Sequence, residues 1–185
     1  MTSTFATRGN VELLSQKKLA VFTSKNTPKT LYPFAERIFS ILCRQELALA
    51  GGWQSPLEKR LFRQIPPSPR THCIHYLAKD INSVYLTKEQ NYLLEENRLL
   101  VIAPHTKQQR ISRQTIEQRD SLIFSQIKNI LFLYIRTDGR LNRYFVQLLQ
   151  MQYNLFVLDH PLNDSYLLDD IVALGEDNAP QIFNY

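Results

Sequence analysis

The stretch KKLAVFTSKNTPKTLYPFAERIFSILCRQELALAGG, residues 17–52, decides the fold. It opens with a short apolar run, Leu19–Phe22, which predicts a buried strand. Between Thr30 and Glu46 the apolar residues recur at spacings of three and four, which predicts an amphipathic helix. A second apolar run, Leu47–Ala50, predicts another strand that ends at two glycines. Strand, helix and strand in this order begin the alternation that is typical of a parallel sheet.

The same alternation continues along the rest of the chain. Further strands are predicted at Cys73–Ala78, Leu99–Ala103, Ile130–Ile135 and Leu155–Leu158. Further helices are predicted from Pro56, over Thr87–Asn97, over Thr115–Ile127, around Leu141–Leu149 and over Leu167–Leu174. The pattern predicts an α/β fold of the Rossmann-like, doubly wound kind, with a mostly parallel sheet of about six strands and helices on both faces. We expect residues 1–18 to form an N-terminal extension and residues 19–185 a single domain.

The composition is that of an ordinary globular domain, with 185 residues, 44% hydrophobic and 21% charged. No apolar run approaches the roughly 20 residues that span a bilayer, and the N-terminus lacks the apolar core of a secretory signal. Cys43 and Cys73 stand singly in apolar contexts. This favours buried free thiols in a reducing cytoplasm over a disulfide or a metal site.

The charge is unevenly distributed along the chain. The net charge is +5, and residues 1–70 hold eleven basic side chains against four acidic ones, whereas residues 159–177 hold six acidic side chains and no basic one. A polyanionic partner such as nucleic acid suits this distribution, and so does a solvated basic surface. Charge alone leaves both interpretations open.

Ligands of doubly wound sheets bind beyond the carboxyl ends of the strands, which makes four loops the candidate functional segments. These are Thr23–Asn26, Gly51–Ser55, Pro104–Arg119 and Arg136–Arg143. Gly51 and Gly52 would let backbone N–H groups approach an anion, or would simply form a tight turn. Trp53 would stack on a base or pack in the core.

Cationic side chains cluster in the last two of these loops. They are Lys107, Arg110, Arg113 and Arg119 in one, and Arg136, Arg140 and Arg143, around Asp138 and Gly139, in the other. Arginine binds phosphate in a bidentate manner, so both clusters suit a nucleic acid or a nucleotide phosphate, although a solvated loop would carry them too. The four histidines lack metal-ligand spacing and there is no nucleophile motif, so we predict no catalytic residue, no metal and no cofactor.

The order of these loops resembles the DNA-processing protein A (DprA/Smf) family, a Rossmann-like group within the SLOG superfamily. RGNVELLSQKKLAVFTSK, residues 8–25, resembles the family's R-G-x-x-E-L-L stretch and its strand ending in G-[ST]-R. The segment LALAGGWQSPLEKRLF, residues 47–62, lies where the family has S-G-x-A-x-G-x-D. The segment around Arg119 and Asp120 resembles the family's R-N motif, and Asp138-Gly139-Arg140 lies at its S-G-T turn.

The resemblance covers roughly residues 7–182 and implies single-stranded DNA binding, dimer formation and loading of a RecA-type recombinase. It places Lys25, after Ser24, at the position of a DNA-facing arginine, and gives pocket positions to Gly51, Gly52, Arg119 and Gly139. The motif glycine before Ser24 is absent, and the motif asparagine is Asp120.

Three hypotheses follow from the sequence. The first is a non-enzymatic protein that binds single-stranded DNA in DNA processing or recombination. Its expected contacts are Ser24, Lys25, Gly51, Gly52, Lys107, Arg110, Arg113, Arg119, Gly139, Arg140 and Arg143, with Trp53 as a candidate for base stacking. The second is a SLOG-type sensor or enzyme for a nucleotide-derived small molecule. The third is a degenerate paralogue that acts through association with another protein.

Overall fold

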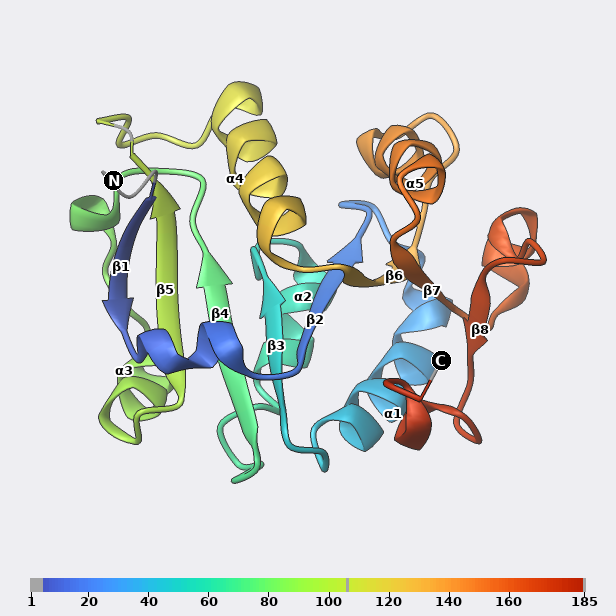
Figure 1. Cartoon of the computed structure of the whole chain (residues 1–185), viewed down its shortest axis with the longest axis horizontal. Helices are drawn as coiled ribbons and strands as arrows, with labels where there is room; N and C mark the ends of the chain where they lie inside the picture. The colour runs from blue at the N-terminus through green and yellow to red at the C-terminus, as the bar shows by residue number, and fades with distance from the viewer. Residues whose placement is uncertain (1–4, 106, 185) are drawn as a thin grey trace.

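The computed structural model describes residues 5–105 and 107–184 as an α/β structure (Figure 1). Its strands are β1 Phe5–Gly9, β2 Lys18–Thr23, β3 Leu47–Gly51, β4 Thr71–Tyr76, β5 Leu99–Pro104, β6 Asn129–Tyr134, β7 Asn154–Leu158 and β8 Val172–Leu174. Its α-helices are α1 Tyr32–Leu42, α2 Pro56–Phe62, α3 Lys88–Glu95, α4 Arg113–Gln126 and α5 Arg140–Gln150. Short 3-10 helices cover Val11–Ser15, Lys29–Leu31, Ile81–Ser83, Pro161–Tyr166 and Ala179–Gln181. All six predicted strands are present, with ends shifted by at most two residues.

The strands form one sheet in the order β1-β5-β4-β3-β2-β6-β7-β8. Every neighbouring pair is parallel except β1 and β5, which are antiparallel. β2 pairs with β3 on one side and with β6 on the other, so the direction in which the chain adds strands reverses between β2 and β6. This reversal is the switch point at which doubly wound sheets bind their ligands.

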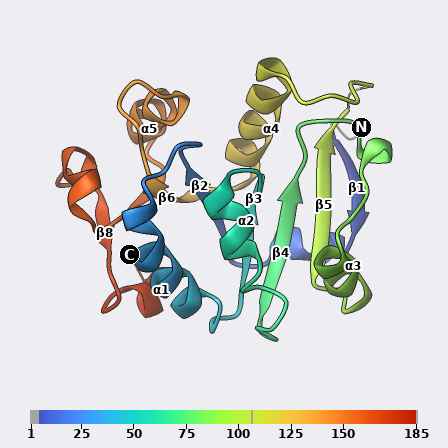
Figure 2. The same cartoon turned by 180° about the vertical axis from the view of Figure 1, so that it is seen from behind.

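Both faces of the sheet are buried, which explains why its strands are near-continuous apolar runs. In β2, Leu19 and Val21 face the core layer under α1, α2 and α3, which Figure 2 shows in front of the sheet. Ala20 and Phe22 face the opposite layer, under α4, α5 and the 3-10 helix Val11–Ser15 (Figure 1). The predicted Rossmann-like, doubly wound fold is confirmed.

The N-terminal segment joins the sheet. β1 pairs antiparallel with β5, and Leu13 of the following 3-10 helix is fully buried. Gly9, at the end of β1, turns the chain into this 3-10 helix with φ +107. A Cβ at this position would collide with the carbonyl oxygen of Leu99. The segment expected to be an N-terminal extension therefore adds an edge strand, and its glycine allows the close approach to β5.

The helix predicted over Leu167–Leu174 is wrong. A 3-10 helix ends at Tyr166, and Val172–Leu174 forms β8 beside β7. The apolar spacing of Ile171 and Leu174 fits one face of a helix, but these side chains lie in opposite core layers, as they do on a strand. Pairing with the open edge of β7 satisfies the backbone of this short segment. The Leu174 carbonyl, for example, accepts the N–H of Asp159, the residue after β7.

Arg98 is a buried cation that fastens the proline-rich loop between α2 and β4. Its guanidinium donates to the carbonyl oxygens of Ile65 at 2.9 Å, Pro66 at 3.1 Å and Thr71 at 2.9 Å, and also to that of Ser68. Only 8% of the residue is exposed. Proline-rich segments have few N–H groups for a ladder, so this side chain supplies the hydrogen bonds that order the loop.

Replacing Arg98 by methionine should therefore lower the free energy of unfolding by about 2–3 kcal/mol, because several carbonyl groups lose charged donors. Urea denaturation followed by circular dichroism measures this loss. Methionine at Arg44, an exposed arginine, is the matched control and should change stability by less than about 0.5 kcal/mol. Equal stability of the two variants would contradict the role of Arg98.

Candidate functional site

Two hollows lie at the carboxyl ends of the central strands. The switch-point hollow, about 330 Å³, is lined by Thr23, Ser24, Lys25, Asn26, Arg136, Gly139, Arg140 and Leu141. The central hollow, also about 330 Å³, is lined by Phe22, Thr23, Lys25, Gly52, Gln54, Ser55, Pro56, Glu58, Ile111, Ile116, Arg119 and Arg140. Thr23, Lys25 and Arg140 line both, so the two hollows adjoin at the switch point. The structure thus brings together six of the predicted residues, namely Ser24, Lys25, Gly52, Arg119, Gly139 and Arg140.

The turn after β2 is ordered by hydroxyl groups. The Ser24 N–H donates to the Tyr134 carbonyl at 3.0 Å, and the Ser24 Oγ accepts the Arg136 N–H at 3.0 Å. The Thr27 hydroxyl donates to the Ser24 carbonyl at 2.6 Å and lies 2.7 Å from the Thr23 hydroxyl. These bonds hold the β2 and β6 loops side by side without a glycine. Lys25 follows as an exposed cation on the walls of both hollows.

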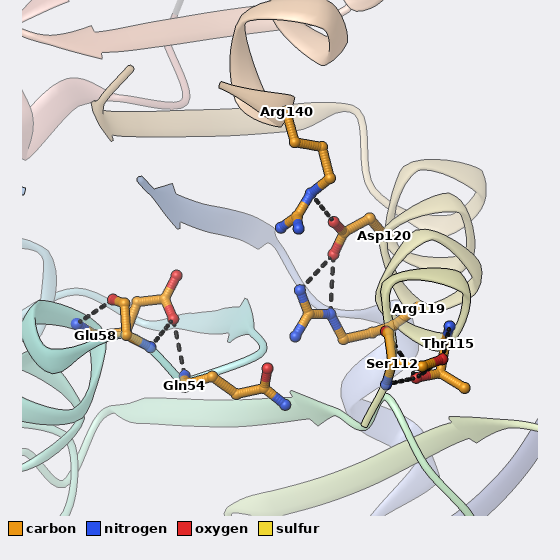
Figure 3. Close-up of polar contacts among 8 residues, drawn as sticks. Gln54, Glu58, Ser112, Thr115, Arg119, Asp120 and Arg140 are labelled. Atoms are coloured by element: carbon orange, nitrogen blue, oxygen red, sulfur yellow. Dashed lines mark hydrogen bonds and ion pairs between the residues drawn. The ribbon is translucent and has the colours of Figure 1, made fainter. Parts of the chain in front are cut away.

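A buried ion-pair network joins α4 to α5 (Figure 3). The fully buried Asp120 Oδ1 accepts the Arg119 Nε–H at 2.9 Å and the Arg119 Nη2–H at 2.6 Å. Its Oδ2 forms an ion pair with Arg140 Nε at 3.1 Å, and within the described part of the chain neither of these two atoms has a hydrogen-bond partner. One carboxylate therefore serves two guanidinium groups and leaves a net positive charge at the switch point.

Gly52 is required by the position of Arg119. A Cβ on Gly52 would overlap the Nη1 and Cζ atoms of the Arg119 guanidinium. Only 5% of Arg119 is exposed, and Asp120 holds its guanidinium in place, so the guanidinium cannot move aside without losing its ion pair. The glycine pair after β3 thus makes room for an arginine of this chain.

The N-terminus of α2 is already occupied by a carboxylate. Glu58 Oε2 accepts the N–H groups of Gln54 at 2.8 Å and Ser55 at 2.9 Å, while the Ser55 hydroxyl accepts the Glu58 N–H (Figure 3). This capping box uses the backbone donors that a phosphate would need. The Gly51–Ser55 loop therefore shapes the wall of the central hollow.

The N-terminus of α5 is open by comparison. Gly139 is the N-cap and has no side chain to accept the first amides, and the first turn contains no acidic residue. The positive end of the helix dipole points into the hollow that Lys25 and Arg140 also line. Unpaired amides, the dipole and two cations together favour an anion such as phosphate at this point.

The other predicted cations lie outside these two hollows. Lys107 lines a separate hollow at the end of β5 with Asp80 and His105. Arg110 and Arg143 are exposed, and Arg113 pairs with Glu117 at 3.1 Å on the surface of α4. They lie on segments that start from the same edge of the sheet but do not converge on the switch point (Figure 1).

Trp53 packs in the core. Only 5% of Trp53 is exposed, and its ring makes edge contacts with Phe39 and Phe62 at centroid distances of 6.1 and 5.7 Å. Its backbone has φ 51, an uncommon conformation for a bulky residue. This arrangement favours the core interpretation of Trp53 over base stacking.

The sequence reasoning missed the role of His75. Its Nδ1 lies 2.9 Å from Gln90 Nε2, whose side-chain oxygen accepts the Thr87 N–H and so caps α3. Burial first, and the positive charge of Arg119 second, lower the pKa of His75 to about 4. The imidazole is therefore neutral near pH 7, and Nδ1 accepts from the Gln90 amide. The sequence showed only a histidine within a strand.

Stability should fall as the pH is lowered from about 6.5 to about 4, partly through His75. In this window the unfolded chain, with a histidine pKa near 6.5, binds a proton that the folded chain excludes. The full shift corresponds to about 3 kcal/mol. Urea denaturation at both pH values should show a smaller pH dependence for His75→Gln than for the unmodified chain, and an unchanged one for the exposed control His105→Gln. Parallel pH profiles would contradict the prediction.

The cysteines are free and buried, as predicted, and burial raises the pKa of Cys43 to about 12. Among residues 5–105 and 107–184, no three His, Cys, Asp or Glu side chains gather in a way that could hold a metal ion. In the same residues no helix combines the length and the apolar character needed to cross a membrane.

Solved structures supply the only matches from three comparisons with known proteins, since no family model and no curated protein matches the chain. DNA processing protein A (DprA) from Streptococcus pneumoniae matches with a TM-score of 0.71 at 16% identity, over 96% of this chain and 65% of that one. DprA from Helicobacter pylori, described in its single-stranded DNA binding mode, matches with a TM-score of 0.69 at 14% identity, over 86% of this chain and 73% of that one. The molybdenum cofactor carrier protein from Chlamydomonas reinhardtii matches with a TM-score of 0.55 at 11% identity, over 89% and 94%.

These likenesses establish a DprA-like fold. The chain spans 65% of the length of the S. pneumoniae protein. The resemblance drawn from the order of the loops is thereby confirmed at the level of the fold.

Proposed function

We propose that the chain binds single-stranded DNA at the carboxyl edge of its sheet and catalyses no reaction there. The observation that carries this proposal is the open N-terminus of α5, which faces the switch-point hollow together with Lys25 and Arg140. A phosphate group seated there would receive backbone N–H donors and two cations. The DprA-like fold supports the proposal, because the related H. pylori protein is described in a single-stranded DNA binding mode.

The layout of charge supports an extended polyanion. Lys25, Arg110, Arg113 and Arg143 all lie on loops or first helical turns at the carboxyl edge, and three of the four have no ion-pair partner among the described residues. Exposed cations of this kind contact a phosphate backbone without reading sequence. The network centred on Asp120 would hold the shape of the site while these cations contact the strand.

Fluorescence anisotropy with a labelled oligo-dT strand and a duplex of equal length tests the proposal. With about four phosphate contacts, affinity for the strand should fall about 50-fold between 50 and 200 mM salt. Lys25→Glu should weaken binding at least tenfold, whereas Lys29→Glu, an exposed lysine outside both hollows, should have a smaller effect. Absence of strand binding at low salt would reject the proposal and would favour association with another protein.

A nucleotide-derived small molecule is the second candidate. The central hollow of about 330 Å³ and the likeness to the molybdenum cofactor carrier protein favour it. Thermal-shift measurements with nucleoside monophosphates separate the candidates. Stabilisation by a monophosphate without any binding of oligonucleotides would select the small molecule.

A further inference from the structure

A third hollow continues the site along the sheet edge. This outer hollow, about 520 Å³, lies beyond the ends of β3 and β4. It shares Gly52, Gln54 and Ile111 with the central hollow, which in turn shares Lys25 and Arg140 with the switch-point hollow. The three form a continuous trough across β4, β3, β2 and β6, a span of about 14 Å at the usual strand spacing.

The walls of the outer hollow combine apolar surface with cations. Phe62, Leu77, Val84 and Ile111 supply apolar surface, and the cations Lys59, Arg63 and Lys79 also line it. Glu89 is the one carboxylate among its described lining residues. Such a hollow suits a planar apolar group carried by a polyanion.

Two polar side chains of its wall, His75 and Gln90, are uncharged near pH 7. His75 and Gln90 bond to each other there, and the neutral imidazole accepts from the amide. They line the hollow without placing a charge under an apolar face. Through Gly52, which lies against Arg119, this wall is also next to the ion-pair network of the central hollow.

Tyr85 stands at the rim with 97% of the residue exposed. The preceding loop is held by local bonds, including Lys79 Nζ to the Ser83 carbonyl at 3.0 Å and the Ser83 hydroxyl to the Asp80 carbonyl at 2.7 Å. Tyr85 lies on an ordered loop, but its ring contacts almost nothing, so it contributes little to the stability of the fold. Its faces are free to stack on a ligand.

We propose that the outer hollow receives an unpaired nucleobase of the strand whose phosphates contact the switch-point hollow, with Tyr85 stacked on that base. The inference rests on the proposed function. It adds a binding site for the nucleobase, the part of the ligand that a phosphate site does not recognise. A base can enter only when it is unpaired, so the hollow also accounts for preference for single strands over duplexes. Stacking is tolerant of base identity, so little sequence preference follows.

Anisotropy titrations with two strands of equal length and charge test the inference. One is oligo-dT, and the other carries abasic residues in place of its bases. Removing the bases should weaken binding by the unmodified chain about 5- to 150-fold, since stacking of one base contributes about 1–3 kcal/mol. Tyr85→Ala should weaken binding of oligo-dT at least fivefold, leave binding of the abasic strand unchanged, and be rescued by Tyr85→Phe. Tyr92→Ala, a half-exposed tyrosine of α3 outside the hollow, is the matched control and should bind both strands normally.

The outcomes separate the two proposals. Equal affinity for the two strands, or equal losses for Tyr85→Ala with both, would overturn the base-binding role and leave strand binding intact. Failure of the unmodified chain to bind either strand would overturn strand binding and the base-binding role with it. Because Tyr85 is exposed, loss of folding does not explain a lower affinity of its variants.

Discussion

Replacing Asp120 by alanine is expected to lower the free energy of unfolding by about 3–5 kcal/mol, the usual cost of removing one partner from a buried ion pair. Asp120 is fully buried and bonds Arg119 through two N–H groups. Without it, the buried Arg119 guanidinium keeps its charge but loses the carboxylate that accepts its two hydrogen bonds. Arg140 has 32% of its side chain exposed and can turn to water, so Arg119 carries most of the loss.

Urea denaturation followed by circular dichroism measures this loss. Arg113→Ala, which breaks the exposed pair with Glu117, is the control and should cost less than about 1 kcal/mol. In a chain that already carries Arg119→Met, the further change Asp120→Ala should cost much less, because no buried guanidinium is left unpaired. A loss below about 1 kcal/mol for Asp120→Ala alone would show that the network does not stabilise the fold.

The sequence predicts the sheet well because its signal is local. Each central strand is a near-continuous apolar run with both faces buried, and α1 and α5 show a clear apolar periodicity. The short edge strands β1 and β8 depend on pairing with β5 and β7, which lie far away in the sequence. Short apolar segments at an edge carry no periodicity of their own, and Ile171 to Leu174 therefore resembled a helix.

The positions of the two hollows agree with the switch-point rule, whereas the contacts that line them do not follow from the sequence. The switch-point rule and the order of the loops indicate where Lys25, Gly52 and Arg140 converge. They do not reveal that Arg119 bonds Asp120. Consecutive residues of a helix point in different directions, so a contact between them is not expected from the sequence. Nor do the rule and the order of the loops show that hydroxyl groups order the turn at Ser24, or that Glu58 occupies the amides before α2. These arrangements depend on side-chain directions that only the folded chain fixes.

The carboxylate of Asp120 has a second consequence, because it competes with any ligand phosphate for Arg140. The ion pair at 3.1 Å lacks the alignment of a hydrogen bond, so the buried Arg140 Nε keeps an unused donor, while other parts of Arg140 line the switch-point hollow. Asparagine at this position keeps the shape of the side chain and removes its negative charge. If the chain binds single-stranded DNA as proposed, Asp120→Asn should therefore bind oligo-dT more tightly while being less stable.

We expect Asp120→Asn to raise the affinity for oligo-dT about tenfold at low salt, as one charge near a phosphate contributes roughly 1–2 kcal/mol in a partly exposed site. Its salt dependence should steepen by about 0.7 in the logarithmic slope, the value for one further phosphate contact. Anisotropy titrations at a temperature where the variant is fully folded measure both quantities. Glu95→Gln, which removes an exposed carboxylate at the end of α3 outside the hollows, is the control and should change affinity by less than about threefold. Removing a competing anion can only strengthen the contact between Arg140 and a phosphate. Weaker binding by Asp120→Asn would therefore show that the carboxylate does not compete but holds Arg140 in its binding position.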